Sequence, residues 1–526
     1  MKTAKGGSLP TSLPAHIEAL LNGSAYPIHP GRIELRQSHV SYLLFTPEFV
    51  YKIKKPVNFG FLDFTSLEKR RFYCDEEVRL NRRLAPEAYL GVVGITEKDG
   101  RYLMGGEGEP MEYAVKMRRL SEERCLERML EAGAVTEELI RRVAHVLASF
   151  HKNAATGGHI SEFGSLEVIG RNTGENFTQT EPFIGKTISQ GLFLKVKEYT
   201  ESFIKANSSL FEKRVAEGFI RDCHGDIHSE HVFAEDGIEI IDCIEFNERF
   251  RFSDVVADES FLSMDLDYHN RHDLSEVLDL AYFAESGDKE GARLLNFYKC
   301  YRAYVRGKVE GFKAFEEEVE EAERSDALLS ALYHFHLSGL YASGGVKPML
   351  LIVCGLPGTG KSTLARGVAE RTGFVHLASD VVRKELAGLK PGEARPESYG
   401  EGIYSEHFTE RTYAELARRA EGLLKHGRSV ITDATFSKKR YLKKVMDAAD
   451  RAGAKAQIIE CFASNSTVRA RLEERRWAVG NVSDADRRIY LGKKAAFEEI
   501  QGPHIVAAAE RTLQENLLKV FRALFD

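Results

Sequence analysis

The chain has 526 residues, of which 43% are hydrophobic and 29% charged, and its formal net charge is -6. This composition, without any biased tract, excludes a largely disordered or low-complexity chain and predicts two to four domains. The longest clear apolar run, Met349–Cys354, is far shorter than the roughly 18 residues of a membrane span. Seven cysteines are scattered singly, which is typical of buried thiols in a reducing compartment. We therefore expect a cytoplasmic protein with no membrane partner.

The charge is unevenly distributed along the chain. From residue 346 onward there are 31 lysines and arginines against 23 aspartates and glutamates, a balance of +8, which leaves −14 for residues 1–345. Opposite signs in the two parts indicate two modules with different ligands. Electrostatic attraction between the two parts is an equally good explanation.

The first part of the chain mixes predicted strands with one helix. Apolar alternation predicts antiparallel strands within Ser41–Lys55, Tyr89–Leu103 and Glu112–Arg118. Between the first two, Ser66–Leu84 has the pattern of a helix. This region is therefore predicted to form a small lobe that is rich in β-structure.

Helical patterns dominate from Thr136 to His151 and again beyond Asp254. They end at a junction, Tyr341–Pro348, where small residues and a proline separate two patterned regions. The acidic run Phe315–Arg324 within this region is typical of a solvated helix face. Strands first and helices later predict an α+β domain of two lobes at residues 1–343, divided near residue 120.

A cluster of acids and histidines lies in this first domain. The loop His224–His231 (HGDIHSEH) is followed, after a short turn, by the apolar strand Ile238–Asp242. In such an arrangement Asp226 can accept a proton from a hydroxyl group, and Asp242 at the strand end can bind Mg²⁺. A hydrogen-bond network without a metal is the alternative explanation for the two carboxylates.

After the junction, strands and helices alternate. Strands are predicted at Met349–Cys354, Gly373–Ala378, Ser429–Thr432 and Ala456–Phe462, and a helix at Ser362–Arg371. Helices between strands indicate a parallel sheet with crossover connections. Residues 344–526 are therefore predicted to be an α/β domain.

The strongest motif follows the first of these strands. Gly355–Ser362 (GLPGTGKS) matches the Walker A pattern at every fixed position, between a strand and a helix. Backbone N–H groups of such a loop surround phosphate oxygens, while its lysine reaches the β- and γ-phosphates. We therefore expect ATP to bind here through Gly355, Gly358, Thr359, Gly360, Lys361, Ser362 and Thr363.

Two carboxylates follow the next strands. Asp380 comes after the second strand, where it can accept a proton from an attacking hydroxyl, and Arg383 three residues on can bind a phosphate. The alternative for Asp380 is a helix cap. Asp433 ends the third strand and is expected to hold Mg²⁺ together with the Ser362 hydroxyl.

An arginine-rich segment, Ser464–Arg476, follows the fourth strand. Arginines on a helix that closes over ATP can stabilise charge on the transferred phosphoryl group. We assign this role to Arg471 and Arg475, with Arg469 and Arg476 beside them. A solvated helix face is the alternative explanation.

The motifs of the second domain resemble those of the P-loop kinases that include polynucleotide kinases and zeta toxins. The resemblance rests on Gly355–Ser362, Asp380 with Arg383, Asp433 and the arginine-rich segment, and it covers most of residues 346–526. It implies that Asp380 is the general base, that Arg383 contacts a phosphate and that an acceptor hydroxyl is phosphorylated. Gluconate-type kinases share the same outline, so the acceptor stays open.

The first domain resembles the aminoglycoside phosphotransferase family, which has the protein-kinase-like fold. Residues 223–258 and 51–68 look closest to bacterial fusion proteins that join such a domain to a C-terminal P-loop kinase. The resemblance implies that Lys52 steadies ATP phosphates, with Glu77 (or Glu76) as its helix partner. The implied architecture is a two-lobed α+β protein-kinase-like domain followed by an α/β P-loop NTPase domain with a parallel sheet.

The first domain departs from the family pattern in two places. His231 stands where the family has an asparagine that binds Mg²⁺ together with Asp242, and imidazole is a poor ligand for that ion. Arg36–Ser41 stands where protein kinases have a glycine-rich loop, and it contains no glycine. These departures leave open whether the first domain is a second phosphotransferase or a ligand sensor.

Taken together, the motifs predict an ATP- and Mg²⁺-dependent phosphotransferase with a hydroxyl-bearing substrate. One alternative is a nucleic-acid 5′-hydroxyl kinase, although no nucleic-acid-binding module or aromatic platform is visible. Another is a nucleotide-dependent switch regulated by a degenerate first domain. A third is an N-terminal domain that modifies a sugar or an antibiotic-like cation on its own.

Overall fold

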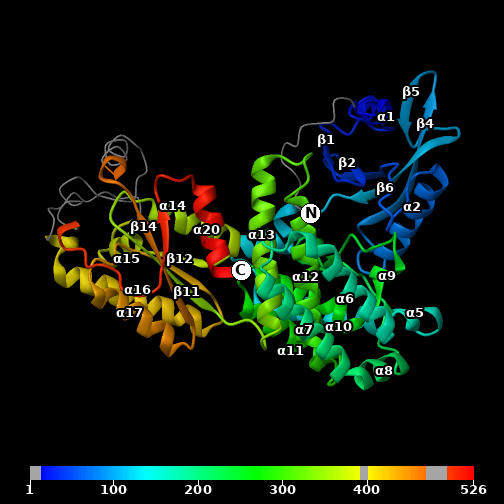
Figure 1. The fold of residues 1–526 in the computed structure, drawn as a ribbon. Helices are drawn as coiled ribbons and strands as arrows, with labels where there is room; N and C mark the ends of the chain where they lie inside the picture. The colour runs from blue at the N-terminus through cyan, green and yellow to red at the C-terminus, as the bar shows by residue number, and fades with distance from the viewer. Residues whose placement is uncertain (1–12, 391–400, 469–493, 526) are drawn as a thin grey trace.

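The first described strands form an antiparallel sheet in the order β1-β2-β3-β6-β4-β5. The computed structural model describes residues 13–390, 401–468 and 494–525 (Figure 1). The predicted strands are confirmed, with β4 and β5 dividing one predicted segment. Their bounds are β1 Glu34–Gln37, β2 Ser41–Phe45, β3 Phe49–Lys54, β4 Tyr89–Lys98, β5 Arg101–Met104 and β6 Pro110–Arg118.

Helix α2 (Leu67–Asn81) packs against this sheet and gives it a buried face. The Ser66 hydroxyl caps the helix by accepting a hydrogen bond from the Lys69 N–H group. Successive side chains of a strand point to opposite faces, so Lys52 and Lys54 of β3 share one face. Glu77 of α2 is fully buried and meets both lysines.

A helical lobe follows the sheet. Helix α4, predicted from residue 136, is confirmed, and Thr136 caps it. The helices of this lobe are α3 Leu126–Glu131, α4 Glu137–Asn153, α5 Gly158–Glu162, α6 Leu166–Thr180, α7 Gln190–Ala206, α8 Ser208–Ala216, α9 Glu248–Arg251, α10 Val255–Tyr268, α11 His272–Ser286, α12 Leu295–Lys313 and α13 Glu321–Tyr341; a short helix α1, Ala15–Ala19, precedes the sheet.

Two short antiparallel pairs of strands hold the acid- and histidine-rich loop. Strand β7 (Ile220–Asp222) pairs with β10 (Phe252–Asp254), and β8 (Val232–Ala234) pairs with β9 (Ile238–Ile240). The loop His224–His231 joins β7 to β8 and is thereby fixed at both of its ends.

The C-terminal part forms a parallel sheet in the order β12-β13-β11-β14-β15. The predicted parallel sheet is therefore confirmed, and the carboxyl ends of its strands meet at one edge. The strands are β11 Met349–Cys354, β12 Val375–Ala378, β13 Val430–Asp433, β14 Lys455–Phe462 and β15 Ile505–Ala508; the helices are α14 Lys361–Thr372, α15 Ser379–Leu386, α16 Glu406–Lys425, α17 Lys439–Arg451 and α20 Leu513–Phe525.

Two further expectations have clear outcomes. The acidic run is not one helix face, because α12 ends at Lys313 and α13 begins at Glu321, so residues 315–320 form the connection between them. All seven cysteines are buried and unpaired, as predicted. None of the helices in the described ranges is long and apolar enough to cross a membrane.

An apolar seam joins the two parts of the chain along α13 (Figure 1). Tyr333 and Leu337 of α13 share a core cluster with Leu351 of β11 and Phe525 of α20, and the Tyr333 and Phe525 ring centroids are 4.9 Å apart. The two parts of the chain therefore share one continuous apolar core. Burial of apolar surface, more than attraction between opposite net charges, holds this seam.

Asn270 adds a polar clamp to the seam. It is fully buried, and its amide donates to the carbonyl oxygens of Gly373 and Ser429 at 3.0 Å each while accepting from the Ser429 N–H group at 2.7 Å. Its backbone has the left-handed conformation, with φ of 56°. Gly373 is required nearby, because an added Cβ would lie 2.7 Å from the His269 carbonyl oxygen.

Replacing Asn270 by glycine tests this clamp, because glycine keeps the left-handed backbone and removes only the amide. We expect the free energy of unfolding to fall by about 2–4 kcal/mol, since buried backbone groups at Gly373 and Ser429 lose their partners. Urea unfolding followed by circular dichroism measures the change. Asp99→Gly, at an exposed left-handed residue, is the matched control and should change stability little; equal stabilities for both variants would exclude the clamp.

Candidate functional sites

The phosphate loop lies between β11 and α14, as its motif predicts. Gly355 has φ of 140°, and a Cβ there would lie 2.4 Å from the carbonyl oxygen of Cys461. Gly358 and Gly360 also have positive φ, and Gly360 caps the N-terminus of α14. The loop therefore needs glycine for both its conformation and its close approach to β14. Lys361 and Ser362 occupy the first turn of α14, at the positive end of the helix dipole.

Asp433, at the carboxyl end of the neighbouring strand β13, is buried beside this loop. Burial would raise the pKa of its carboxyl, but the neighbouring His376 imidazole, the charge of Lys361 and the nearby Ser362 hydroxyl lower it below its usual value. Its Oδ1 atom is buried without a hydrogen-bond partner among the described residues. An ionised carboxylate oxygen without a partner and a neighbouring hydroxyl oxygen are ligands of the type that Mg²⁺ prefers.

Asp380 and Arg383 lie on α15, which follows β12 at the same edge of the sheet. Asp380 is in the first turn of the helix and is half-buried. Arg383 is buried and donates to the Ile403 carbonyl oxygen at 2.6 Å and to the Thr409 hydroxyl at 3.2 Å. Its Nε atom has no partner among the described residues. Arg383 thus anchors the start of α16 against α15.

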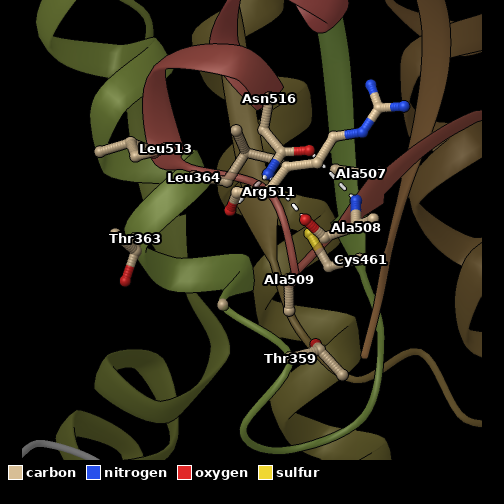
Figure 2. Close-up of a pocket in the computed structure, with 11 residues that line it drawn as sticks. Thr359, Thr363, Leu364, Cys461, Ala507, Ala508, Ala509, Arg511, Leu513 and Asn516 are labelled. Carbon is tan, nitrogen blue, oxygen red and sulfur yellow. Dashed lines mark hydrogen bonds between the residues drawn. The ribbon is translucent and has the colours of Figure 1, made fainter. Parts of the chain in front are cut away.

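A cavity of about 330 Å³ opens on the other side of the phosphate loop, next to α14 (Figure 2). Its apolar lining includes Leu364 and Leu513 together with the alanines of β15 and the turn after it. Cys461 lies at its wall, where burial raises the pKa of the thiol to about 12. Asn516 pairs its amide with both backbone groups of Ala508 and so fixes the turn. The cavity has the size and apolar character of a small-molecule site.

Arg469, Arg471, Arg475 and Arg476 lie outside the described residues, so their predicted role remains a prediction.

In the first domain, the structure brings Lys52, Glu77 and Asp242 together. The Lys52 Nζ atom lies 2.8 Å from Glu77 Oε1 and 2.6 Å from Asp242 Oδ1. Burial would lower the pKa of Lys52, but Asp242 and Glu77 raise it well above its usual value. The open choice of helix partner is settled in favour of Glu77, because Glu76 pairs with Arg79 instead.

The acid- and histidine-rich loop lies next to this ion cluster. His231 Nε2 lies 3.5 Å from Asp242 Oδ2, and Asp226 Oδ2 lies 3.7 Å from both His228 Nε2 and His231 Nδ1. Burial would raise the pKa of Asp226, but His228 and His231 hold it below its usual range. Asp242 has φ of 65°, an uncommon backbone conformation for a residue other than glycine.

Several supporting residues were not predicted as site residues. Lys54 pairs with Glu77 at 2.6 Å and also with Glu245, which extends the buried ion cluster. Asp258 accepts hydrogen bonds from the N–H groups of His224 at 2.9 Å and Gly225 at 2.7 Å, and so fixes the start of the loop. The two-residue spacing of Lys52 and Lys54 could have predicted that both side chains lie on the same face of the strand. No local pattern pointed to Glu245.

Comparison with known proteins supports the assignment of the C-terminal part. Residues 350–500 match a family model described as an AAA domain. The chain is 35% identical over 410 residues to the uncharacterized protein Rv2004c of Mycobacterium tuberculosis, a match that covers 77% of this chain and 78% of that protein. With the phosphate loop and the parallel sheet, the family match identifies a P-loop kinase-like α/β domain in the C-terminal part.

Two solved structures are also similar to part of the chain. A gluconokinase from Sinorhizobium meliloti 1021 has a TM-score of 0.25 and 17% identity, covering 34% of this chain and 91% of its own. The Mycobacterium tuberculosis APS kinase CysC, in complex with AMPPNP and APS, has a TM-score of 0.26 and 16% identity, covering 34% of this chain and 99% of its own.

The geometry of Gly355 gives a direct test of the phosphate loop. In Gly355→Ala the new Cβ meets the backbone of β14, so the loop must shift, and we expect ATP binding to weaken at least tenfold. Isothermal titration calorimetry measures this affinity. Gly453→Ala is the matched control: it also has positive φ, 66°, but has open space around the new Cβ. Equal ATP affinity in both variants would argue against nucleotide binding at this loop.

Proposed function

Because the chain belongs to the same family as the mycobacterial protein Rv2004c and contains a P-loop kinase domain, we propose that its C-terminal site transfers the γ-phosphate of ATP to a hydroxyl group. One observation carries the proposal: the phosphate loop, the buried Asp433 and the half-buried Asp380 lie at the same edge of one parallel sheet. Ligands of open α/β sheets bind at this edge.

The phosphate loop binds the triphosphate through backbone N–H groups and through the Lys361 ammonium group. Ser362 and Asp433 would hold Mg²⁺, since both offer oxygen ligands and the buried Asp433 Oδ1 has no described partner. When bound, the ion would neutralise charge on the β- and γ-phosphates. His376 Nε2 lies 3.4 Å from Asp433 Oδ2, the other oxygen of this carboxylate.

Asp380 is the proposed general base. Neighbouring strands are about 4.8 Å apart, and β12 lies two strands from β11, so we expect Asp380 roughly 10 Å from the phosphate loop, with the acceptor between them. As the acceptor oxygen forms its bond to the γ-phosphorus, its proton passes to the Asp380 carboxylate. The bond from the γ-phosphorus to the bridging oxygen breaks, and ADP leaves with that electron pair.

The cavity beside α14 is the proposed site of the adenine base. It adjoins Thr359, Gly360 and Thr363 of the nucleotide loop, and its apolar wall suits a flat aromatic ring. The nucleotide would then lie along the phosphate loop from the cavity at one end to Asp433 at the other. The acceptor would approach from the β12 side.

Arginines complete the proposed site. We propose that Arg471 and Arg475 stabilise charge on the transferred phosphoryl group and that Arg383, through its free Nε side, contacts a phosphate of the substrates. The excess of basic residues after residue 346 favours an anionic acceptor.

An assay with labelled γ-phosphate tests the general base and searches for the acceptor among sugars, nucleosides and 5′-hydroxyl oligonucleotides. We expect Asp380→Asn to reduce transfer about 100-fold or more while ATP affinity changes less than twofold, because only proton acceptance is lost. Asp447→Asn, on the exposed face of α17, is the matched control. Full transfer by Asp380→Asn would remove Asp380 from the mechanism.

The same assay separates the alternatives. Transfer confined to 5′-hydroxyl oligonucleotides would establish a nucleic-acid kinase. ATP hydrolysis without any phosphorylated acceptor would support a nucleotide-dependent switch. Transfer that Lys361→Ala leaves intact and Asp226→Asn abolishes would move the main activity to the first domain.

For the first domain, we propose a second phosphotransferase or nucleotide-sensing site of the protein-kinase-like type. The supporting observation is the Lys52 ammonium group held between Glu77 and Asp242, with His231 in contact with both Asp242 and Asp226. In this arrangement Lys52 would bind ATP phosphates, Asp226 would accept a proton from an acceptor hydroxyl, and Asp242 would help to hold a metal ion. The absence of glycine in residues 36–41 predicts weak ATP binding there.

Counting bound nucleotides tests this second site. We expect two ATP molecules per chain in the wild type, one in Lys361→Ala and one in Lys52→Met, because each variant removes the cation that meets the phosphates at one site. Calorimetric stoichiometry measures the counts, and circular dichroism controls for folding of Lys52→Met. A single ATP that disappears in Lys361→Ala would show that the first domain does not bind ATP.

A further inference from the structure

His231 and Asp242, which flank the β8–β9 pair, contact each other next to Lys52. Both imidazoles of this loop, His228 and His231, are buried at 4% exposure, whereas the Asp226 and Asp242 side chains are partly open to solvent. The ligand atoms of Asp226, His228 and His231 all lie within 4.8 Å of one another.

The hydrogen bonds of His231 fix which ring nitrogen carries the proton. Its Nδ1 atom lies 2.8 Å from the backbone carbonyl oxygen of Asp226. A carbonyl oxygen only accepts, so Nδ1 carries the proton and donates it. In a neutral imidazole, Nε2 then has a lone pair and no proton. This lone pair faces Asp242 Oδ2 at 3.5 Å, so two electron-rich atoms face each other without a hydrogen between them.

The gap between these two atoms has the size of a metal bridge. Metal–nitrogen and metal–oxygen bonds of about 2.0–2.2 Å at a tetrahedral angle separate the two ligand atoms by roughly 3.4 Å. The other oxygen of Asp242 is held by Lys52 at 2.6 Å, which orients the carboxylate. A backbone carbonyl that binds the second nitrogen of a metal-ligating histidine is the usual orienting contact at such sites.

We propose that this site binds a divalent transition metal through His231 Nε2 and Asp242 Oδ2. Mg²⁺ does not fit the donor set, because it prefers oxygen ligands, whereas imidazole suits Zn²⁺ or Co²⁺. The proposal gives a role to the imidazole that is a poor ligand for magnesium. It holds whether the first domain transfers phosphate or only senses a ligand.

A second cluster in the same domain provides an internal contrast. His151, Cys223 and Asp258 also lie within ligand distance of one another. However, His151 uses Nδ1 on the Tyr282 hydroxyl at 2.8 Å and Nε2 on Asp258 at 3.1 Å. Asp258 in turn binds two backbone N–H groups. This cluster is hydrogen-bonded throughout and needs no ion.

Titration of the untagged full chain with Co²⁺ tests the proposal. The protein is stripped with a chelator, kept free of nucleotide and carries Asp433→Asn, so that the proposed metal site of Ser362 and Asp433 loses its carboxylate. We expect one equivalent of Co²⁺ with visible d–d absorption, displaced by Zn²⁺ but not by a 100-fold excess of Mg²⁺. No thiolate-to-cobalt band is expected, because Cys223 belongs to the other cluster.

His231→Asn supplies the decisive comparison, because it replaces the nitrogen ligand with an oxygen ligand of similar reach. We expect Co²⁺ affinity to fall at least tenfold and the preference for Co²⁺ over Mg²⁺ to narrow by a similar factor. His145→Asn, at an exposed histidine of α4, is the matched control and should bind Co²⁺ as before. Circular dichroism checks that both variants fold.

Two results would overturn the proposal. One is the lack of stoichiometric Co²⁺ binding by the folded, stripped protein. The other is Co²⁺ binding that survives His231→Asn but is lost in Cys223→Ala, which would place the metal at the hydrogen-bonded cluster instead.

Discussion

A buried ammonium group must be paired, and Lys52 meets that constraint by joining three parts of the first domain. Its partners come from α2 and from the turn after β9, while Lys52 itself is on β3. Because a buried charge that loses its partner costs several kcal/mol, the small lobe, its helix and the loop between the lobes are fixed relative to one another. Lys54, also on β3, is buried as well and is paired in the same way, with Glu77 and Glu245. The site geometry follows from this pairing.

The two proposed sites supply positive charge to a phosphate by different means. In the C-terminal domain, backbone N–H groups and the start of α14 do most of this work, so glycines and a left-handed backbone are required. In the first domain the backbone loop is replaced by side chains, and the positive charge of Lys52 is already shared with Glu77 and Asp242. A nucleotide there would compete with two carboxylates for one ammonium group.

Local sequence patterns predicted the elements that depend on local chemistry. The phosphate loop was recognisable because its glycines and lysine are consecutive, and the strand ends at Asp433 and Ala378 were recognisable from short apolar runs. Glu245 could not be predicted, because its pairing with Lys54 spans 191 residues and only the folded chain brings the two together. The tautomer of His231 was equally invisible, since a backbone carbonyl fixes it. The acidic run Phe315–Arg324 was predicted as one helix face, but only its part from Glu321 onward is helical, because charge pattern alone does not reveal where a helix ends.

Helix α10 links the two sites physically. Asp258, near its start, accepts hydrogen bonds from the N–H groups of His224 and Gly225 at the start of the histidine loop. Asp265, about two turns further along the helix, accepts a hydrogen bond from the Ser229 N–H group at 2.8 Å. Just beyond its end, Asn270 binds the backbone at Gly373 and Ser429, where β12 and β13 begin. The helix is buried along nearly its whole length, so it has little freedom to shift independently of its surroundings. The histidine loop and the parallel sheet are therefore held by one rigid element, and a change in the position of either site must be accommodated by that shared helix.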